Sequence, residues 1–170
     1  MKHTISLAML LLFSVTTLFA QHKKGDKPRV SPHETVTGKH IKVTYGRPYK
    51  KGRDIFGGLE AYGKVWRTGA DEATEITFDK DGMFAGKPVK AGTYTLFTIP
   101  GKDSWTIILN SELNQWGAFG YDKVKDKNVL ESDVPAKHLD KVVEQFTISV
   151  TGGGVQLEWD HTSVMIPAKF

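Results

Sequence analysis

The sequence has no cysteine among its 170 residues. This absence excludes disulfide bonds, thiol catalysis and thiolate metal sites. Cross-links are not needed at this length, because a domain of about 150 residues buries roughly 68–70% of the surface of its unfolded chain. The sequence therefore predicts a fold that depends on an apolar core alone.

Long hydrophobic runs are also scarce, and the longest covers residues 5–13 near the N-terminus. A membrane-spanning helix needs about 20 apolar residues, so this run is too short to be a typical span. Lys2 precedes it and the small residue Ala20 follows it, as in a secretory signal peptide. We predict cleavage before Gln21, export to the periplasm or cell exterior, and no integral membrane segment afterwards. A retained N-terminal anchor is the alternative.

A strong excess of one charge is missing as well. Without residues 1–20, the chain carries 22 basic and 19 acidic residues, a formal charge of +3. This small excess argues against nucleic acid as a partner. Residues 21–30 are polar and basic and include Gly25 and Pro28, so they are expected to form a flexible lead-in. Residues 31–170 then make a single domain.

No clear helical period extends over more than about ten residues; instead, apolar and polar residues alternate in several short segments. The clearest of these segments are residues 41–45, 75–78, 146–150 and 155–159. Alternation of this kind puts one face of a strand on the core and the other in water, as in antiparallel sheets. The pattern predicts an all-β fold, an antiparallel β-sandwich with a jelly roll as one variant.

Turn signals separate the segments, above all the glycines at 152–154 and the Pro-Gly-Lys-Asp run at 100–103. Residues 136–145 are ambiguous between a short helix and the approach to a strand. Trp105 and Trp159 are in phase with apolar neighbours and are expected in the core. Trp116 lies in a glycine-rich segment, where it forms either an exposed stacking surface or a plug at one end of the fold.

The most unusual segment runs from Lys39 to Thr74. Between residues 39 and 67 there are eight Lys or Arg residues but only two acids, Asp54 and Glu60. Aromatic residues are interleaved with them, and the glycine-bearing connection between residues 45 and 65 is long for a compact domain. Long loops of this type often carry function.

We take this segment as the candidate ligand-binding region. The candidate residues are Tyr45, Arg47, Arg53, Trp66, Arg67, Thr68, Asp71 and Glu72. Arginine forms bidentate contacts with carboxylate, sulfate or phosphate, and aromatic faces stack on sugars. The leading hypothesis is a non-enzymatic, exported binding or scaffold module for an anionic small molecule or a glycan. Alternatively, the arginines pair internally with the acids of the segment.

Two other functions stay open. An envelope-polymer hydrolase would use Asp71 or Glu72 as acid or base, although adjacent residues on a strand face opposite ways. A purely structural envelope protein would need no site. The sequence has no G-x-S-x-G elbow and no phosphate-binding loop. Its histidines lack metal-ligand spacing, so neither a metal nor a cofactor is expected.

Four runs of the sequence closely resemble the uncharacterised family catalogued as domain of unknown function 2911. They are residues 45–48 (YGRP), 52–57 (GRDIFG), 63–74 and 91–100 (AGTYTLFTIP). The resemblance extends from about Ser31 to the C-terminus and implies an exported bacterial protein, without implying an activity, substrate or cofactor. The family pattern has Asn where this chain has Asp71. A hydrogen-bonding or structural role is therefore favoured over a carboxylate function at that position.

Overall fold

The computed structural model describes residues 28–170 of the chain. The predicted signal peptide and residues 21–27 of the predicted lead-in lie outside the described residues. Pro28, Arg29 and Val30, the last residues of that lead-in, are exposed.

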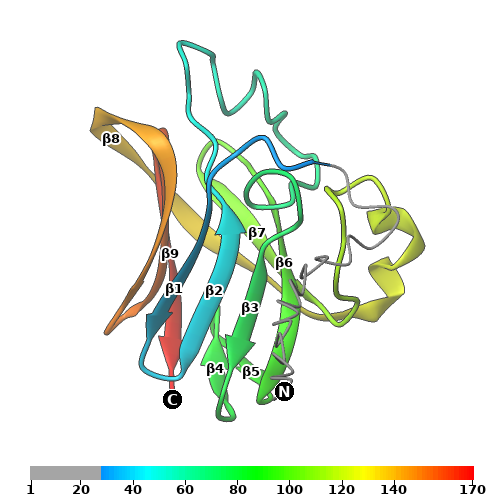
Figure 1. Ribbon diagram of the computed structural model, residues 1–170. Helices are drawn as coiled ribbons and strands as arrows, with labels where there is room; N and C mark the ends of the chain where they lie inside the picture. The colour runs from blue at the N-terminus through cyan, green and yellow to red at the C-terminus, as the bar shows by residue number, and fades with distance from the viewer. Residues whose placement is uncertain (1–27) are drawn as a thin grey trace, which may run out of the picture.

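Nine antiparallel strands make up most of the described chain, in the hydrogen-bonded order β1-β2-β3-β6-β7-β8-β9-β4-β5 (Figure 1). They are β1 His33–Gly38, β2 Ile41–Gly46, β3 Glu75–Phe78, β4 Gly82–Phe84, β5 Lys87–Val89, β6 Gly92–Ile99, β7 Ser104–Asn110, β8 Asn128–Thr151 and β9 Gly154–Lys169. The only helical elements in residues 28–170 are two 3-10 turns, η1 Tyr121–Lys123 and η2 Lys125–Lys127. The prediction of an all-β antiparallel fold is confirmed.

The sheet is continuous instead of being divided between two separate hydrogen-bonded layers. The reason is the length of β8, whose first part pairs with β7 and whose second part pairs with β9. The C-terminal end of β9 then pairs with β4. Figure 1 shows β8 crossing from one side of the molecule to the other, so that the sheet folds back over itself.

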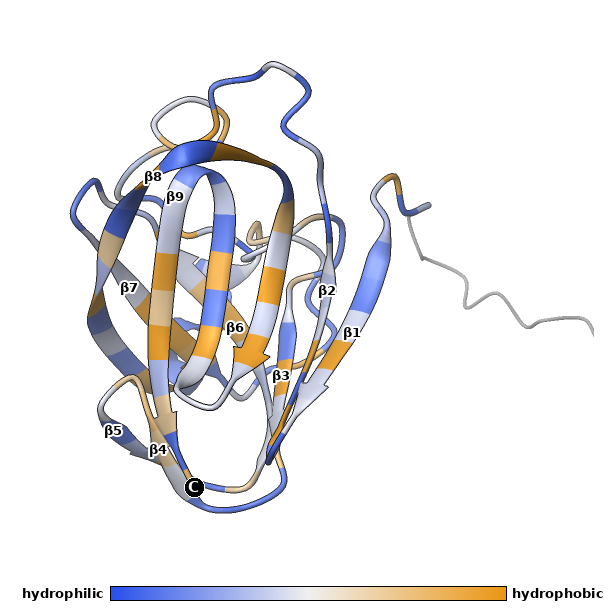
Figure 2. Cartoon of the chain, turned by 90° about the vertical axis from the view of Figure 1, so that its left-hand side faces the viewer, coloured by the Kyte–Doolittle hydropathy of each residue, from blue (hydrophilic) through white to orange (hydrophobic). Residues whose placement is uncertain are grey.

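Residues 136–145, ambiguous in the sequence, belong to β8. The pairing of β8 with β9 shifts register between His138 and Val143 and again between Val143 and Thr147. Extra residues at such irregularities disrupt the two-residue alternation, which explains the weak helical pattern. On either side of this region, Figure 2 shows hydrophobic and hydrophilic bands alternating along β8 and β9.

The main core lies between the two halves of the folded sheet. Ile41 and Val43 of β2 belong to it together with Phe146 and Ile148 of β8. The hydroxyl of Tyr45 accepts the N–H of Ile148 at 2.9 Å, which joins β2 to β8 across the core.

An aromatic cluster occupies one end of this core. Trp105 and Trp159 are each 1% exposed, as predicted from their phase. The ring centroids of Trp66 and Trp159 lie 5.9 Å apart in a stacked arrangement, and Phe56 lies edge-on to Trp105 at 4.8 Å. Trp66 and Phe56 come from the long loop between β2 and β3, so this cluster fixes the base of the loop to the sheet.

Candidate functional site

The connection between β2 and β3, residues 47–74, forms the loop at the upper end of the sheet in Figure 1. Isolated bridges pin this loop to three other parts of the chain. Tyr49 pairs with Gln145 of β8, Trp66 with Thr98 of β6, and Glu72 with Trp116. Several of its side chains are therefore held against the body of the protein in spite of its length.

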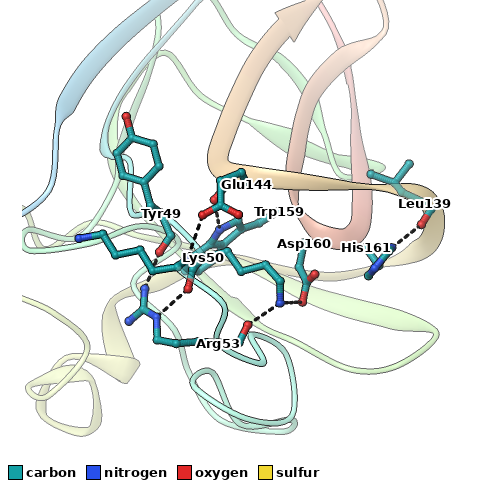
Figure 3. A network of polar contacts seen from close by, with 9 residues as sticks. Tyr49, Lys50, Arg53, Leu139, Glu144, Trp159, Asp160 and His161 are labelled. Carbon is teal, nitrogen blue, oxygen red and sulfur yellow. Dashed lines mark hydrogen bonds and ion pairs between the residues drawn. The ribbon is translucent and has the colours of Figure 1, made fainter.

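Backbone carbonyls orient Arg53 within this loop, as Figure 3 shows. Its Nε donates to the carbonyl oxygen of Lys50 at 2.9 Å, and Nη2 donates to that of Tyr49 at 2.5 Å. Lys50 in turn donates from Nζ to Asp160 Oδ2 at 3.3 Å. The turn needs left-handed backbone at Lys51 (φ 50°) and at Gly52 (φ 69°), and glycine adopts this conformation without strain.

A pocket of about 460 Å³ opens between this loop, the N-terminal described residues and Trp116. We call it the arginine pocket. It is lined by Val30, Ser31, Pro32, Pro48, Tyr49, Lys51, Arg53, Leu59, Glu60, Arg67, Gly69, Ala70, Asp71, Trp116 and Trp159. Its volume lies within the range of about 300–1,000 Å³ that is typical of small-molecule sites.

Arg67 enters the pocket with most of its hydrogen-bonding capacity unused. Its Nε donates to the carbonyl oxygen of Gly69 at 3.3 Å. Across residues 28–170, no ion pair joins Arg53 or Arg67 to a carboxylate within 4.0 Å. A Cβ built at Gly117 (φ 70°) would lie 3.1 Å from Arg67 Nη1, so the glycine backbone packs closely beside the guanidinium.

Glu60 is the acid that lines the pocket together with these arginines. Burial raises the pKa of Glu60 to about 7, and the positive charges of Arg67 and Arg53 only partly offset that effect. Its side-chain carboxyl forms no hydrogen bond with any residue in the range 28–170. The group therefore has free hydrogen-bonding capacity and changes protonation near neutral pH.

Asp71, which also lines the pocket, has a different role. It is 6% exposed, and its Oδ2 accepts the N–H of Val30 at 3.1 Å and that of Ser31 at 2.9 Å. These bonds hold the N-terminal described residues along one edge of the pocket. The contact is consistent with the hydrogen-bonding role that the family resemblance favours for position 71.

Glu72 points elsewhere, as expected for two adjacent residues. It forms an ion pair with Arg29 at 2.5 Å and is absent from the pocket lining. Burial acts to raise the pKa of Glu72, but the hydrogen bond and charge of Arg29, a backbone hydrogen bond and the charge of His33 together lower it. Asp71 and Glu72 therefore do not converge on one point.

The remaining sequence candidates lie outside the pocket. Tyr45 and Trp66 are buried in the core, and Thr68 is buried with its hydroxyl 3.0 Å from that of Thr98. Arg47 forms an ion pair with Glu34 at 2.5 Å and donates to the carbonyl oxygen of Phe146, which ties the end of β2 to β8. Of the eight candidates, the structure brings together Arg53, Arg67 and Asp71.

The pocket also contains residues that the sequence did not single out as ligand contacts. The sequence predicts Glu60 only as an internal ion-pair partner of the arginines; its position as one of two acids in a basic segment is the signal that could have indicated more. For Trp116 the sequence left two alternatives, an exposed stacking residue or a plug at one end of the fold. In the structure Trp116 is half-buried in the pocket wall. Tyr49, Lys51 and Leu59 complete the same wall.

Within residues 28–170, no group of three or more His, Cys, Asp or Glu side chains is arranged to hold a metal ion. No helix in these residues has the length and apolar character required to cross a membrane.

Comparison with known proteins places the chain in a family. No curated protein and no solved structure matches it. The family model described as "Protein of unknown function (DUF2911)" matches residues 27–168, which include all nine strands except the last residue of β9 and every residue of the arginine pocket. The resemblance seen in the four sequence runs therefore extends over most of the protein, and the chain belongs to the DUF2911 family.

Proposed function

We propose that this protein is a binding module whose arginine pocket takes a small ligand with an anionic group. The observation that carries the proposal is the presence of Arg53 and Arg67 in one pocket without a carboxylate partner in the described chain. Arg53 is exposed, but Arg67 is half-buried, and a charge at that depth is normally paired because desolvation without compensation is costly. An anionic ligand would supply the missing partner.

The two arginines favour an anion for a geometric reason as well. A guanidinium presents parallel N–H donors that match the oxygens of a carboxylate, sulfate or phosphate. Arg53 is held in position by two backbone carbonyls, so little conformational entropy is lost when it binds. Lys51 adds a third positive charge to the lining.

The rest of the wall suits a ligand with an apolar or ring-shaped body. Tyr49, Leu59 and Trp116 line the pocket beside the charged groups. Small-molecule sites commonly combine such apolar surface with a few polar groups that fix the orientation of the ligand. This composition supports binding of a small organic anion over capture of a bare inorganic ion.

The proposal is tested with Arg67→Ala and Arg67→Lys. Hydrogen bonds to charged groups contribute about 1.5–3 kcal/mol, so Arg67→Ala should weaken anion binding by roughly ten-fold or more. Arg67→Lys keeps the charge but loses the planar fork, and it should bind with intermediate affinity. Isothermal titration calorimetry with D-glucuronate, inorganic phosphate and inorganic sulfate measures the affinities.

Lys125→Ala is the matched control, because Lys125 is exposed in η2 and lies outside the pocket. It removes one positive charge and should leave the affinities unchanged. Since Arg67 has no carboxylate partner, both Arg67 variants should fold, with about 1 kcal/mol or less lost in stability. Equal affinities in wild type and Arg67→Ala, or no anion binding by wild type, would refute the proposal.

A further inference from the structure

We infer that the arginine pocket selects a hydroxylated acid, in the first instance a sugar acid, with its acid group at Arg53 and Arg67 and a hydroxyl group at Glu60. The inference rests on the proposed function and adds the chemical class of the ligand. It depends on the placement of a carboxyl group in the same pocket as the two arginines.

The carboxyl of Glu60 restricts which chemical group of the ligand can lie next to it in the pocket. Asp71, the other acid in the lining, already accepts two backbone N–H groups. The carboxyl of Glu60 has no hydrogen-bond partner in residues 28–170, so a ligand group can pair with it. A second anionic group of the ligand would be repelled there whenever Glu60 is ionised.

A hydroxyl group fits this position in both protonation states of Glu60. A hydroxyl both donates and accepts, whereas an ionised carboxylate only accepts and a protonated carboxyl also donates. Because the pKa of Glu60 lies at about 7, both forms are populated near neutral pH. A ligand hydroxyl can bond to either form, whereas a second carboxylate can bond only to the protonated form. An ammonium can donate to both forms, but it would be repelled by Lys51, Arg53 and Arg67 in the same lining.

The aromatic part of the wall agrees with a sugar ring. Trp116 and Tyr49 line the pocket together with Arg53, Glu60 and Arg67. Aromatic rings with a polar tip provide broad apolar contact beside polar groups. The C–H face of a pyranose ring offers the matching apolar surface, while its edge carries the hydroxyl and acid groups.

The experiment compares three ligands, each of which contains one six-membered ring. D-Glucuronate has the acid and the hydroxyl groups, D-glucose lacks the acid, and cyclohexanecarboxylate lacks the hydroxyls. Calorimetry at about pH 7 should show D-glucuronate binding at least roughly ten-fold more tightly than either analogue, since each lost charged hydrogen bond is worth about that factor.

Variants of Glu60 then assign the preference to its carboxyl. Glu60→Met keeps the approximate length of the side chain but cannot hydrogen-bond a hydroxyl. This variant should bind D-glucuronate and cyclohexanecarboxylate with similar affinity. The binding that it retains for both acids verifies that the pocket is intact. Glu60→Gln retains donor and acceptor groups, so it should keep most of the preference.

The outcomes separate this inference from the proposed function. If wild type binds both acids equally, or if Glu60→Met keeps the preference for D-glucuronate, the inference is overturned and anion binding stands. If neither acid binds wild type, the inference is overturned, and the proposed function is overturned with it when inorganic phosphate and sulfate also fail to bind. If D-glucose binds as tightly as D-glucuronate, the acid has no role and both again fail. Circular dichroism of each variant verifies folding. If Glu60→Met is unfolded, Glu60→Gln is the test, and loss of its preference for D-glucuronate would overturn the inference.

Discussion

Arg47 and Arg67 show how different two arginines of one basic segment can be. The guanidinium of Arg47 pairs with Glu34 and donates to the carbonyl oxygen of Phe146, so its hydrogen bonds hold strands together. Arg67 donates from Nε to the carbonyl oxygen of Gly69 and is one of the residues that line the pocket. Residue type suggested the same role for both, and their partners distinguish a structural arginine from a candidate ligand contact.

Glu60 should make stability fall as the pH rises. Its pKa is raised from the usual 4.5 to about 7 in the folded protein. Between these values the folded state binds the proton more tightly than the unfolded state, so the contribution is fully present below about pH 4.5 and is lost as the pH passes 7. We expect Glu60→Gln to flatten this part of the stability profile, as measured by urea unfolding between about pH 5 and pH 8.

Asp122→Asn is the control for this measurement, because Asp122 is an exposed acid of η1 outside the pocket. It should leave the pH profile parallel to that of wild type. Parallel profiles for wild type and Glu60→Gln would show that the Glu60 carboxyl does not bind its proton more tightly in the folded state.

At the scale of elements, the pair β8 and β9 determines the shape of the sheet. β8 pairs with β7 as far as Pro135 and with β9 from Ala136 onward, on both sides of its irregular region. The hairpin between them returns through the glycines at 152–154, as their spacing predicted. One long bent strand thus contains both residues 146–150, which were predicted as a strand, and residues 136–145, for which a short helix and the approach to a strand were the alternatives.

Gly154 should be intolerant of a side chain. It has φ of 140°, and a Cβ at this position would lie 2.0 Å from the carbonyl oxygen of Ile166. Since the conflict is with backbone and cannot be relieved by a rotamer change, Gly154→Ala should cost about 3 kcal/mol or more. Chemical denaturation of the purified variant measures the loss.

Gly152→Ala is the matched control in the same turn, where an added Cβ meets nothing within 4 Å. It should change the stability by about 0.5 kcal/mol or less. If the two variants unfold at the same denaturant concentration, the close approach of β9 to this turn is not a constraint on the fold.

On the scale of the whole molecule, the predicted export signal precedes the described sheet in the sequence. The nine strands span residues 33–169, so cleavage before Gln21 would leave the sheet and the arginine pocket intact. An anion-binding module outside the cytoplasm would meet carbohydrates of the cell envelope or surroundings. Export and ligand class are thus compatible proposals that are tested independently.

We predict that the native host exports the protein with Gln21 as its first residue. Intact-mass spectrometry of the exported protein should give the mass of residues 21–170. Leu11→Arg interrupts the apolar run and should leave the chain uncleaved in the cell. Wild-type protein that begins at Met1 and is recovered with the membrane fraction would support a retained anchor.

The sequence by itself determined the fold class, because the signals for strands are local. Alternation along residues 41–45 and 155–159 and the turn glycines required no knowledge of distant contacts. The same phase placed Trp105 and Trp159 in the core. The sequence also indicated, by the charge and length of the loop, the segment in which a site would lie.

Only the tertiary structure decided which residues of that loop meet in a pocket. Arg53 and Arg67 line the same pocket as Trp116, and the N–H of Val30 donates to Asp71 at the pocket edge, across about forty positions of sequence. Such contacts depend on how the sheet folds back and on where the loop is pinned, and neither has a local signature. The raised pKa of Glu60 is likewise a product of the folded structure, because its main cause is burial.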